Sequence, residues 1–473
     1  MAVEAISFLF LKGCKMKDLF VKEIITQVFS VYNYTPNYSE DLILEERKTD
    51  VVSKIKDKFK IEATGEFCIL KIEFYLKLDK DFYEYKGSMK IMRAKQYLQH
   101  ASFIGLNCIK VLRSLMYPYA AKSIDRAMVV SMIEKTIEES IIAMSLGKKQ
   151  VNALADPLVD KVSMLFRELS VWSNRTYEGR KIPFSFVINA EKVSSNLDMI
   201  DDINIFLKDD SSALLSDGIT SYFLISDHIE YKIADVYNPE SKYKKIPLVP
   251  YRFSSVANVC TANNIGIILT VQGDLLIIKK TKLIYAKRNG VWHYYDYDSF
   301  NNALFKDIKE MDTILESKNK IKKIYISCLD TAFARTGGCL AICSQKNLSK
   351  IKTNIRLEDI HRPFSRLNRQ QDQNKKRFMI EDVIIKKNNF YEMSRKALQE
   401  LMGIDGATVI LTNGKFITTG AIIDNKCKKE FKDKETQGGA RKKIAKKLSE
   451  YGLAIKISSD GYIECYKNGM HIF

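Results

Sequence analysis

The spacing of apolar residues changes along the chain, and each change predicts a different kind of structure. Residues 69–78 alternate imperfectly between apolar and polar side chains, which is typical of a strand. From about residue 88 to about residue 170, apolar residues recur at intervals of three and four, which predicts amphipathic helices with buried stripes. We therefore expect a mixed, mainly helical N-terminal region over residues 1–174.

A strand-rich pattern follows in the middle of the chain. The run at residues 183–189 is strand-like, and short apolar runs between residues 265 and 296 are separated by turn residues, which predicts a β-meander. Gln272-Gly273-Asp274 is the clearest of these turns, and a further run, Val291–Tyr295, follows Asn289-Gly290. Residues 175–298 should form a β-rich middle domain. The polar segment Arg175–Arg180 at its start is interpreted as a hinge or capping turn, with a polar site as the alternative.

The last region, residues 299–473, mixes both periodicities. Ser299 is a plausible N-cap for a first helix, and a second helix should end before the Gly337-Gly338 break, which leads into a buried strand at 339–343. The polar, basic stretch 361–377 is expected to be a surface loop.

The pattern of residues 391–473 predicts a helix, a hairpin, a second helix and a second hairpin. The first helix should end at Gly403, because glycine commonly terminates helices. The Asn413-Gly414 and Asp460-Gly461 dipeptides predict the two hairpin turns. The fold class expected for this region is therefore α/β.

Composition narrows the class of protein. The chain has 473 residues and 46% hydrophobic residues, which is consistent with a globular protein of two to four domains. The nine cysteines include no Cys-x-x-Cys pair, and the five histidines include no closely spaced pair, so we expect free thiols and no structural zinc site. The sequence contains no recognisable secretory signal and no apolar run of about 18 residues, which predicts a cytoplasmic protein without a membrane partner.

The net charge favours anionic partners. Lys and Arg number 75 against 57 Asp and Glu, which gives +18. Nucleotides, nucleic acids and acidic membrane faces all fit such an excess, and a solvated basic surface is the alternative.

Two segments near the C-terminus have the chemistry of a nucleotide site. In Asp405-Gly406-Ala407, a carboxylate precedes a glycine where a helix meets a strand; it can hold Mg²⁺ or orient a ribose hydroxyl, and the glycine permits close approach of a ligand. In Gly438-Gly439, two glycines open a helix that carries cations, which together can bind phosphate. A solvated basic helix end is the alternative. These cations are Arg441, Lys442 and Lys443.

The order of these elements resembles the diadenylate cyclase (DAC) family, which includes DNA-integrity-scanning and membrane-linked bacterial enzymes. The family's Asp-Gly-Ala signature matches Asp405-Gly406-Ala407, and its Gly-Thr-Arg-His-Arg-x-Ala signature matches residues 439–445. Its Ser-Glu-Glu signature corresponds to Ser458, Ser459 and Asp460. The resemblance covers residues 300–473 and implies an α/β fold with a mixed central sheet and flanking helices.

The resemblance also implies a chemistry. Family members bind one ATP per protomer, and two protomers meet face to face to form cyclic di-AMP and pyrophosphate. Asp405 would hold the metal, Mg²⁺ or Mn²⁺, or activate the hydroxyl, while Arg441, Lys442 and Lys443 would bind the triphosphate. A homodimer or higher oligomer through the DAC-like domain follows from this mechanism.

The departures from the family pattern decide which function we expect. Ala440 replaces a threonine, Lys442 and Lys443 replace His and Arg, and Ser459 replaces a carboxylate. Lysine keeps the charge but lacks the planar fork of arginine. We expect a nucleotide-binding sensor or regulatory module for ATP or a cyclic dinucleotide, with a role in bacterial defence suggested by its layout.

Two alternatives remain open. The first is an active diadenylate cyclase, a nucleotidyltransferase that retains Asp405. The second is a nucleic-acid-binding protein that uses the basic stretches 346–377 and 428–447, although no recognised DNA-binding motif supports it.

Overall fold

The structure is a computed structural model that describes the greater part of the chain in two compact units. The described residues are 21, 23–32, 45–49, 58–64, 67–78, 81–91, 98–116, 126–148, 153–193, 197–210, 212, 217–234, 246–309, 314–348, 355–356, 388–423 and 439–473. The first unit comprises Met1–Ala234, Val259–Lys280 and Ile284–Tyr294. The second comprises Asp235–Asn258, Thr281–Leu283 and Tyr295–Phe473.

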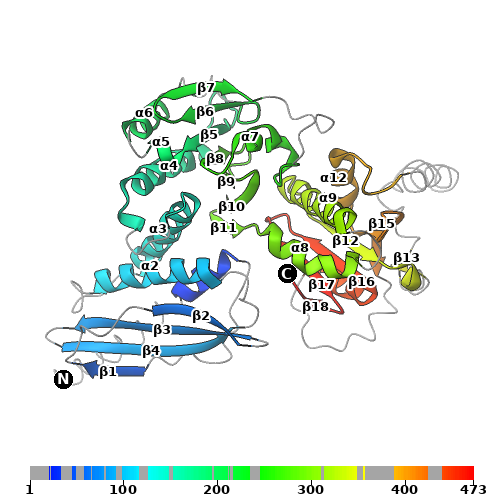
Figure 1. Ribbon diagram of the computed structural model, residues 1–473, viewed down its shortest axis with the longest axis horizontal. Coiled ribbons are helices and arrows are strands. Elements are labelled where there is room, and N and C mark those ends of the chain that lie inside the picture. The colour runs from blue at the N-terminus through cyan, green and yellow to red at the C-terminus, as the bar shows by residue number, and fades with distance from the viewer. Residues whose placement is uncertain are drawn as a thin grey trace. The chain divides into compact units, whose positions relative to one another are not determined.

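Both units combine helices with a seven-stranded sheet that contains parallel and antiparallel pairs (Figure 1). The mixed α/β class predicted from the sequence is therefore confirmed. None of the described helices is long and apolar enough to cross a bilayer. The predicted helical and strand-rich regions both fall mainly within the first unit.

In the first unit, helical residues 21 and 23–30 precede a four-stranded antiparallel sheet of order β1-β4-β3-β2. Its strands are β1 (Glu45–Thr49), β2 (Lys58–Thr64), β3 (Phe67–Leu78) and β4 (Asp81–Ile91). The strand predicted at 69–78 is confirmed as part of β3. Helix α2 packs against β2 and β3 (Figure 1).

The helices predicted between about residues 88 and 170 are also confirmed. They are α2 (Leu98–Met116), α3 (Arg126–Ser145) and α4 (Pro157–Asn174). The shorter α5 (Ala190–Val193) and α6 (Asp198–Phe206) lie in the region predicted to be β-rich and were not predicted. The start of α4 follows from its sequence, because the Asp156 side chain accepts the N–H of Leu158 at 3.0 Å and Pro157 needs no amide partner in the first turn.

The seven-stranded sheet of the first unit has the order β11-β10-β9-β8-β5-β6-β7. Its strands are β5 (Phe184–Asn189), β6 (Ser221–Ile225), β7 (Ile229–Ile233), β8 (Asn264–Leu269), β9 (Leu275–Lys279), β10 (Lys282–Arg288) and β11 (Val291–Tyr294). The meander predicted between residues 265 and 296 corresponds to β8 through β11, in which each strand pairs with the next.

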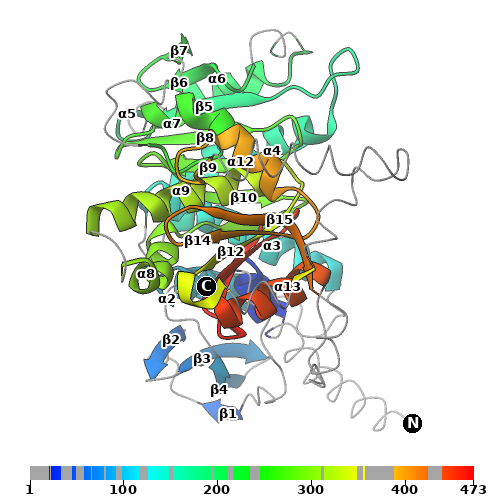
Figure 2. The same cartoon turned by 90° about the vertical axis from the view of Figure 1, so that its right-hand side faces the viewer.

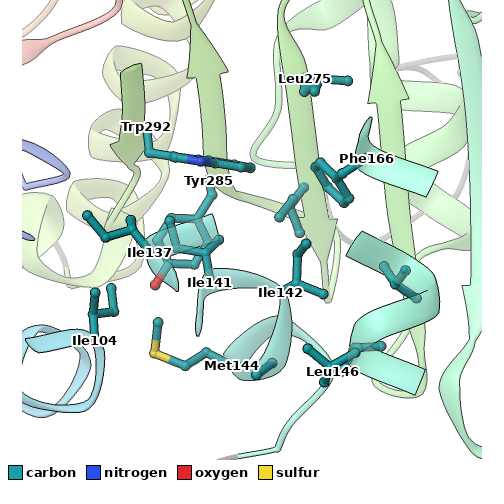
Figure 3. Close-up of a cluster of buried hydrophobic side chains, with 14 of the residues drawn as sticks. Ile104, Ile137, Ile141, Ile142, Met144, Leu146, Phe166, Leu275, Tyr285 and Trp292 are labelled. Carbon is teal, nitrogen blue, oxygen red and sulfur yellow. The ribbon is translucent and has the colours of Figure 1, made fainter. Parts of the chain in front are cut away.

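The core of the first unit lies between α2, α3, α4 and this sheet. Figure 3 shows Ile104, Ile137 and Ile141 from α2 and α3 near the aromatic rings of Tyr285 and Trp292. These side chains are 5% exposed or less. The three isoleucines lie on helices for which the three- and four-residue spacing predicted a buried stripe.

The polar segment at 175–180 is a tight turn. Tyr177 and Arg180 exchange both backbone hydrogen bonds at 2.9 Å, and Glu178 and Gly179 have φ of 48° and 75°. Positive φ at both central residues is characteristic of a type I′ hairpin turn. This geometry favours the turn interpretation over a polar site.

The sheet of the second unit has the order β13-β15-β14-β12-β16-β17-β18. Figure 2 shows three of these strands, β15, β14 and β12, side by side. Its strands are β12 (Gly338–Cys343), β13 (Ile355–Arg356), β14 (Ala407–Leu411), β15 (Phe416–Ile423), β16 (Gly452–Ile457), β17 (Ile463–Lys467) and β18 (Met470–His471). The helices are α7 (Ser254–Val259), α8 (Tyr297–Lys309), α9 (Ile314–Phe333), α12 (Arg395–Met402) and α13 (Ala440–Leu448). The order predicted for 391–473 is thus present, whereas the loop expected at 361–377 lies outside the described residues.

The predicted N-cap of α8 was wrong by three residues. The helix begins at Tyr297, and the Asp296 carboxylate accepts the N–H of Ser299 at 3.1 Å. Asp296 is therefore the N-cap, and Ser299 supplies the amide that needs an acceptor in the first turn. The carboxylate three residues upstream was the signal that the sequence interpretation missed.

A buried ion pair joins the two helices that lead to the ends of β12 and β14. Arg395 at the start of α12 binds both carboxylate oxygens of Asp330 in α9, at 2.6 and 2.7 Å, and the two side chains are only 9% and 2% exposed. Burial raises the pKa of Asp330, and the Arg395 charge opposes that effect. The same two side chains also bind the segment 246–258, which we call the linker segment because it lies between β7 and β8 in the chain. Arg395 donates to the carbonyl of Val249, and Asp330 accepts the N–H of Tyr251, both at 2.7 Å.

This ion pair gives a first prediction. Replacing Arg395 with alanine leaves the Asp330 carboxylate buried without its cation, so we expect the second unit to lose about 3–5 kcal/mol of stability. Urea unfolding of the full chain, followed by a probe in the second unit, would measure this loss.

Lys396→Ala is the matched control, because Lys396 is 70% exposed and its pair with Glu400 is a surface pair. It should change stability by less than about 1 kcal/mol. A double variant Asp330→Ala/Arg395→Ala should cost less than the sum of the two single changes. Additive losses would show that the pair does not act as a unit.

Candidate functional site

Three strand ends and one helix start meet at one end of the seven-stranded sheet in the second unit. The edge meant here is the border formed by the ends of the strands. Strands β12 and β14 are parallel, with Leu340 opposite Thr408, so both begin at this edge. Strand β16 is antiparallel to β12, with Gly338 opposite Ile457, so it ends there. Helix α13 leads into the far end of β16, so its N-terminus points back to the same edge. We call this edge the glycine edge, because it holds Gly337, Gly406 and Gly439.

Arg441 lies directly over the start of β12. A methyl group placed on Gly337 would lie 2.7 Å from Nη1 of Arg441 and 3.1 Å from both the Ile457 carbonyl oxygen and the Ser459 nitrogen. The Arg441 side chain is half-buried, and among the described residues no carboxylate forms an ion pair with it. Arg441 therefore brings a cation to the point where β12 begins and β16 ends.

The Arg441 charge also affects the pKa of the neighbouring Cys339 thiol. Burial raises the pKa of Cys339 to about 12, and the Arg441 charge acts in the opposite direction. The thiol is fully buried and stays protonated at neutral pH, so it is a core residue and not a nucleophile. The other described cysteines are also buried thiols outside any disulfide, as expected from the sequence: Cys108, Cys260, Cys328, Cys343 and Cys465.

Backbone segments approach one another closely around Asp405. Gly406 has φ of 104°, and a methyl group there would lie 2.5 Å from the carbonyl carbon of Gly420 and 2.8 Å from the oxygen of Ala421. The β14–β15 ladder is irregular on the adjoining residues, between Ala407 and Ile410. Only glycine fits at 406, because a side chain would collide with the backbone of β15.

Asp405 is exposed at the glycine edge. One carboxylate oxygen accepts the N–H of Gly406 at 3.1 Å, which orients the side chain. The loop that carries Asp405 lies beside the residues before β12, because a methyl group on Gly403 would lie 3.1 Å from the Thr336 hydroxyl. The Asp-Gly-Ala segment and the segment before β12 are thus neighbours at the site.

The turn after β16 completes the edge. The N–H of Asp460 donates to the Ser458 hydroxyl at 3.3 Å, and the N–H of Gly461 donates to the Ser458 carbonyl at 3.1 Å. Ser459 is half-buried, with its nitrogen near Gly337, and Asp460 is exposed. Arg441 and Ser459 approach the same point, because a methyl group on Gly337 would lie 2.7 Å from Nη1 of Arg441 and 3.1 Å from the Ser459 nitrogen.

The remaining predicted cations lie further along the first turn of α13. Gly439 is the exposed N-cap residue, and no acidic residue occupies the first turn. Lys442 is half-buried, whereas Lys443 is exposed on the side of the helix away from the buried Ala445. Gly438, also predicted as a site residue, lies outside the described residues.

A charged pair on the same face was missed by the sequence interpretation. Lys456 lies opposite Cys339, and its ammonium group is 2.8 Å from the Glu464 carboxylate, which also accepts the Tyr466 hydroxyl at 2.8 Å. Burial would raise the pKa of Glu464, but Lys456 and Tyr466 hold it below its ordinary value. The available signal was a lysine and a glutamate in otherwise apolar strands. Gly337, also not chosen, was signalled by its place before a fully apolar strand.

The described residues contain no cluster of three or more His, Cys, Asp or Glu side chains that could hold a metal ion by themselves. A single exposed carboxylate such as Asp405 fits a different arrangement. Mg²⁺ is commonly held by one or two carboxylates together with substrate phosphates and water. The residues present therefore fit a metal that arrives with a nucleotide.

Comparison of the chain with protein-family models, curated proteins and solved structures gave no match. The interpretation of the glycine edge accordingly rests on its residues and their geometry.

The close contacts at Gly406 give a second prediction. Gly406→Ala should destabilise the second unit by more than the cost of a positive φ alone, because the new methyl group collides with the backbone of β15. Gly469→Ala is the control: Gly469, in the turn between β17 and β18, has φ of 73°, but a methyl group there would meet no atom within 4 Å. We expect about 1–2 kcal/mol for the control and a larger loss for Gly406→Ala in urea unfolding. Equal losses would mean that β15 moves aside without cost.

Proposed function

We propose that the second unit binds a nucleotide at the glycine edge and that the protein is a nucleotide sensor or regulatory module. The observation that carries this proposal is Arg441. This half-buried guanidinium has no carboxylate partner among the described residues, and it lies beside the backbone nitrogen of Ser459 and the N-terminus of α13. A cation, backbone N–H groups and a helix N-terminus together favour a phosphate group.

The arrangement of elements supports a DAC-like domain. Asp405-Gly406-Ala407 lies where α12 passes into β14, and Arg441 lies in the first turn of α13 before β16. A mixed seven-stranded sheet separates helix α13 from helix α9, because alternate residues of β12 face each side. The resemblance predicted this order of motifs and this class of sheet.

The proposed roles follow from the positions. Arg441 would bind a phosphate oxygen, with Lys442 adding positive charge, and the N–H groups of the first turn of α13, after Gly439, would donate to phosphate oxygens. Asp405 would hold Mg²⁺ or Mn²⁺ brought with the nucleotide, or would orient a ribose hydroxyl. The metal, when bound, would neutralise phosphate charge.

The residues on either side of Arg441 in α13 favour binding of a nucleotide without reaction. Cyclisation needs the α-phosphate aligned with an attacking hydroxyl, and misplacement of reacting groups by about 1 Å can cost about 100-fold in rate. Ala440 supplies no hydroxyl at the first position of α13, and Lys443 is directed to solvent. The active diadenylate cyclase remains the second candidate function, because the exposed Asp405 carboxylate is retained.

Binding of ATP and of cyclic di-AMP to the full chain, with and without Mg²⁺, tests the proposal. Arg441→Ala should weaken binding about 10- to 100-fold, since a hydrogen bond to a charged group contributes about 1.5–3 kcal/mol. Lys443→Ala removes the same charge from an exposed position two residues away and should weaken binding less than about threefold. No saturable binding would overturn the proposal, and equal weakening by both changes would show a diffuse charge effect instead of a site.

A second measurement separates the sensor from the cyclase. Labelled ATP is incubated with the full chain and Mn²⁺, and the products are separated. We expect saturable binding without a cyclic product. A cyclic dinucleotide that forms with the natural sequence and disappears in Asp405→Asn would establish the cyclase.

A further inference from the structure

Strand β7 forms one edge of the seven-stranded sheet in the first unit. It pairs with β6 on one side, and in the described part of the chain no strand pairs with its other side. Its sequence is Ile229-Glu230-Tyr231-Lys232-Ile233. An open edge presents a row of backbone donors and acceptors that can accept another strand.

The hydrogen-bond pattern shows which residues face outward. Ala234 donates to the Thr220 carbonyl at 2.6 Å, and Ser226 donates to the His228 carbonyl at 3.0 Å. In an antiparallel ladder, hydrogen-bonded and non-hydrogen-bonded pairs alternate. The even-numbered residues of β7 therefore bond to β6, and the backbone groups of Ile229, Tyr231 and Ile233 point to the open edge.

This strand is complementary to itself in the antiparallel direction. A two-fold axis through Tyr231 would pair Tyr231 with Tyr231, and Ile229 with Ile233, of the second copy. These are the residues whose backbone groups point outward, so each would exchange both hydrogen bonds with its partner. The same register sets Glu230 opposite Lys232 twice, in the non-hydrogen-bonded pairs where side chains approach most closely.

The two faces of β7 suit this pairing. Tyr231 and Ile233 are 49% and 76% exposed on one face, which is unusual for large apolar residues on adjacent positions of a strand face. On the other face, Glu230 already pairs with Lys232 of its own strand at 2.8 Å. Pairing with a second copy would extend the apolar face across the axis and join the charges between chains.

We propose that two copies of this chain associate through β7, in antiparallel register centred on Tyr231, to form one continuous sheet. This interface lies in the first unit and does not depend on the nucleotide site. It is also distinct from the face-to-face association of DAC-like domains that the family resemblance implies.

Charge reversal on the full chain tests the register. Either Glu230→Lys or Lys232→Glu alone sets like charges opposite each other twice, so each variant should dissociate at concentrations about tenfold or more above those of the natural chain. An equal mixture of the two variants restores every Glu–Lys pair and should form a heterodimer. Analytical ultracentrifugation with one variant labelled measures both outcomes, and Glu178→Lys, in an exposed turn, is the charge control.

A backbone test is independent of charge. Tyr231→Pro removes an N–H that points to the open edge and bonds to no residue of β6, so the sheet should still fold. It should abolish the dimer, whereas Tyr231→Ala, which keeps that N–H, should weaken it less. A natural chain that stays monomeric at high concentration would overturn the proposal, and so would a dimer unaffected by all these changes, since it would form through another surface.

Discussion

The backbone ladder of β12 is the constraint on which the candidate site depends. Its parallel pairing with β14 and antiparallel pairing with β16 bring three segments that are distant in sequence to one edge of the sheet. β12 is fully buried, so its register is fixed by packing on both faces. A slip of one residue would reverse its faces and separate Gly337 from Arg441. The register of β12 therefore brings the parts of the site together, and the particular side chains can act only once that register is set.

A second constraint acts on the loops that lead into this edge. Helix α9 ends just before Gly337, and α12 ends just before Asp405, so the Asp330–Arg395 pair fixes the helices from which both loops emerge. The same pair holds Val249 and Tyr251 of the linker segment 246–258. Breaking a buried charge pair is costly, so this cluster can keep both loops in place without any contact with a ligand.

Periodicity and turn residues predicted most of the described elements. β15 was expected at Phe416–Ile423, where the structure has it, because a hairpin signal and an apolar run set its limits locally. The predicted N-cap of α8 was wrong because both Asp296 and Ser299 can cap a helix, and in the structure the Asp296 carboxylate accepts the N–H of Ser299.

The candidate site was less predictable than the fold. Asp405 and Arg441 could be chosen from local motifs, but their shared edge follows from sheet topology. Gly337 and the Lys456–Glu464 pair are also long-range features: Gly337 matters because Arg441 packs over it, and Lys456 because Glu464 lies across the ladder. Self-complementarity of β7 was likewise hidden, because the outward direction of Tyr231 depends on which residues of β6 it faces.

Geometry, more than charge, distinguishes the possible functions of the glycine edge. Arg441 is directed onto the strand ends, but Lys443 two residues later is directed to solvent, so the three successive cations of this helix are not held equally. One fixed cation and several backbone donors are sufficient to bind a phosphate group. In-line transfer requires every reacting atom to be held, which a flexible lysine does less well than the planar fork of arginine. For this reason we propose a site that detects a nucleotide and not one that joins two of them.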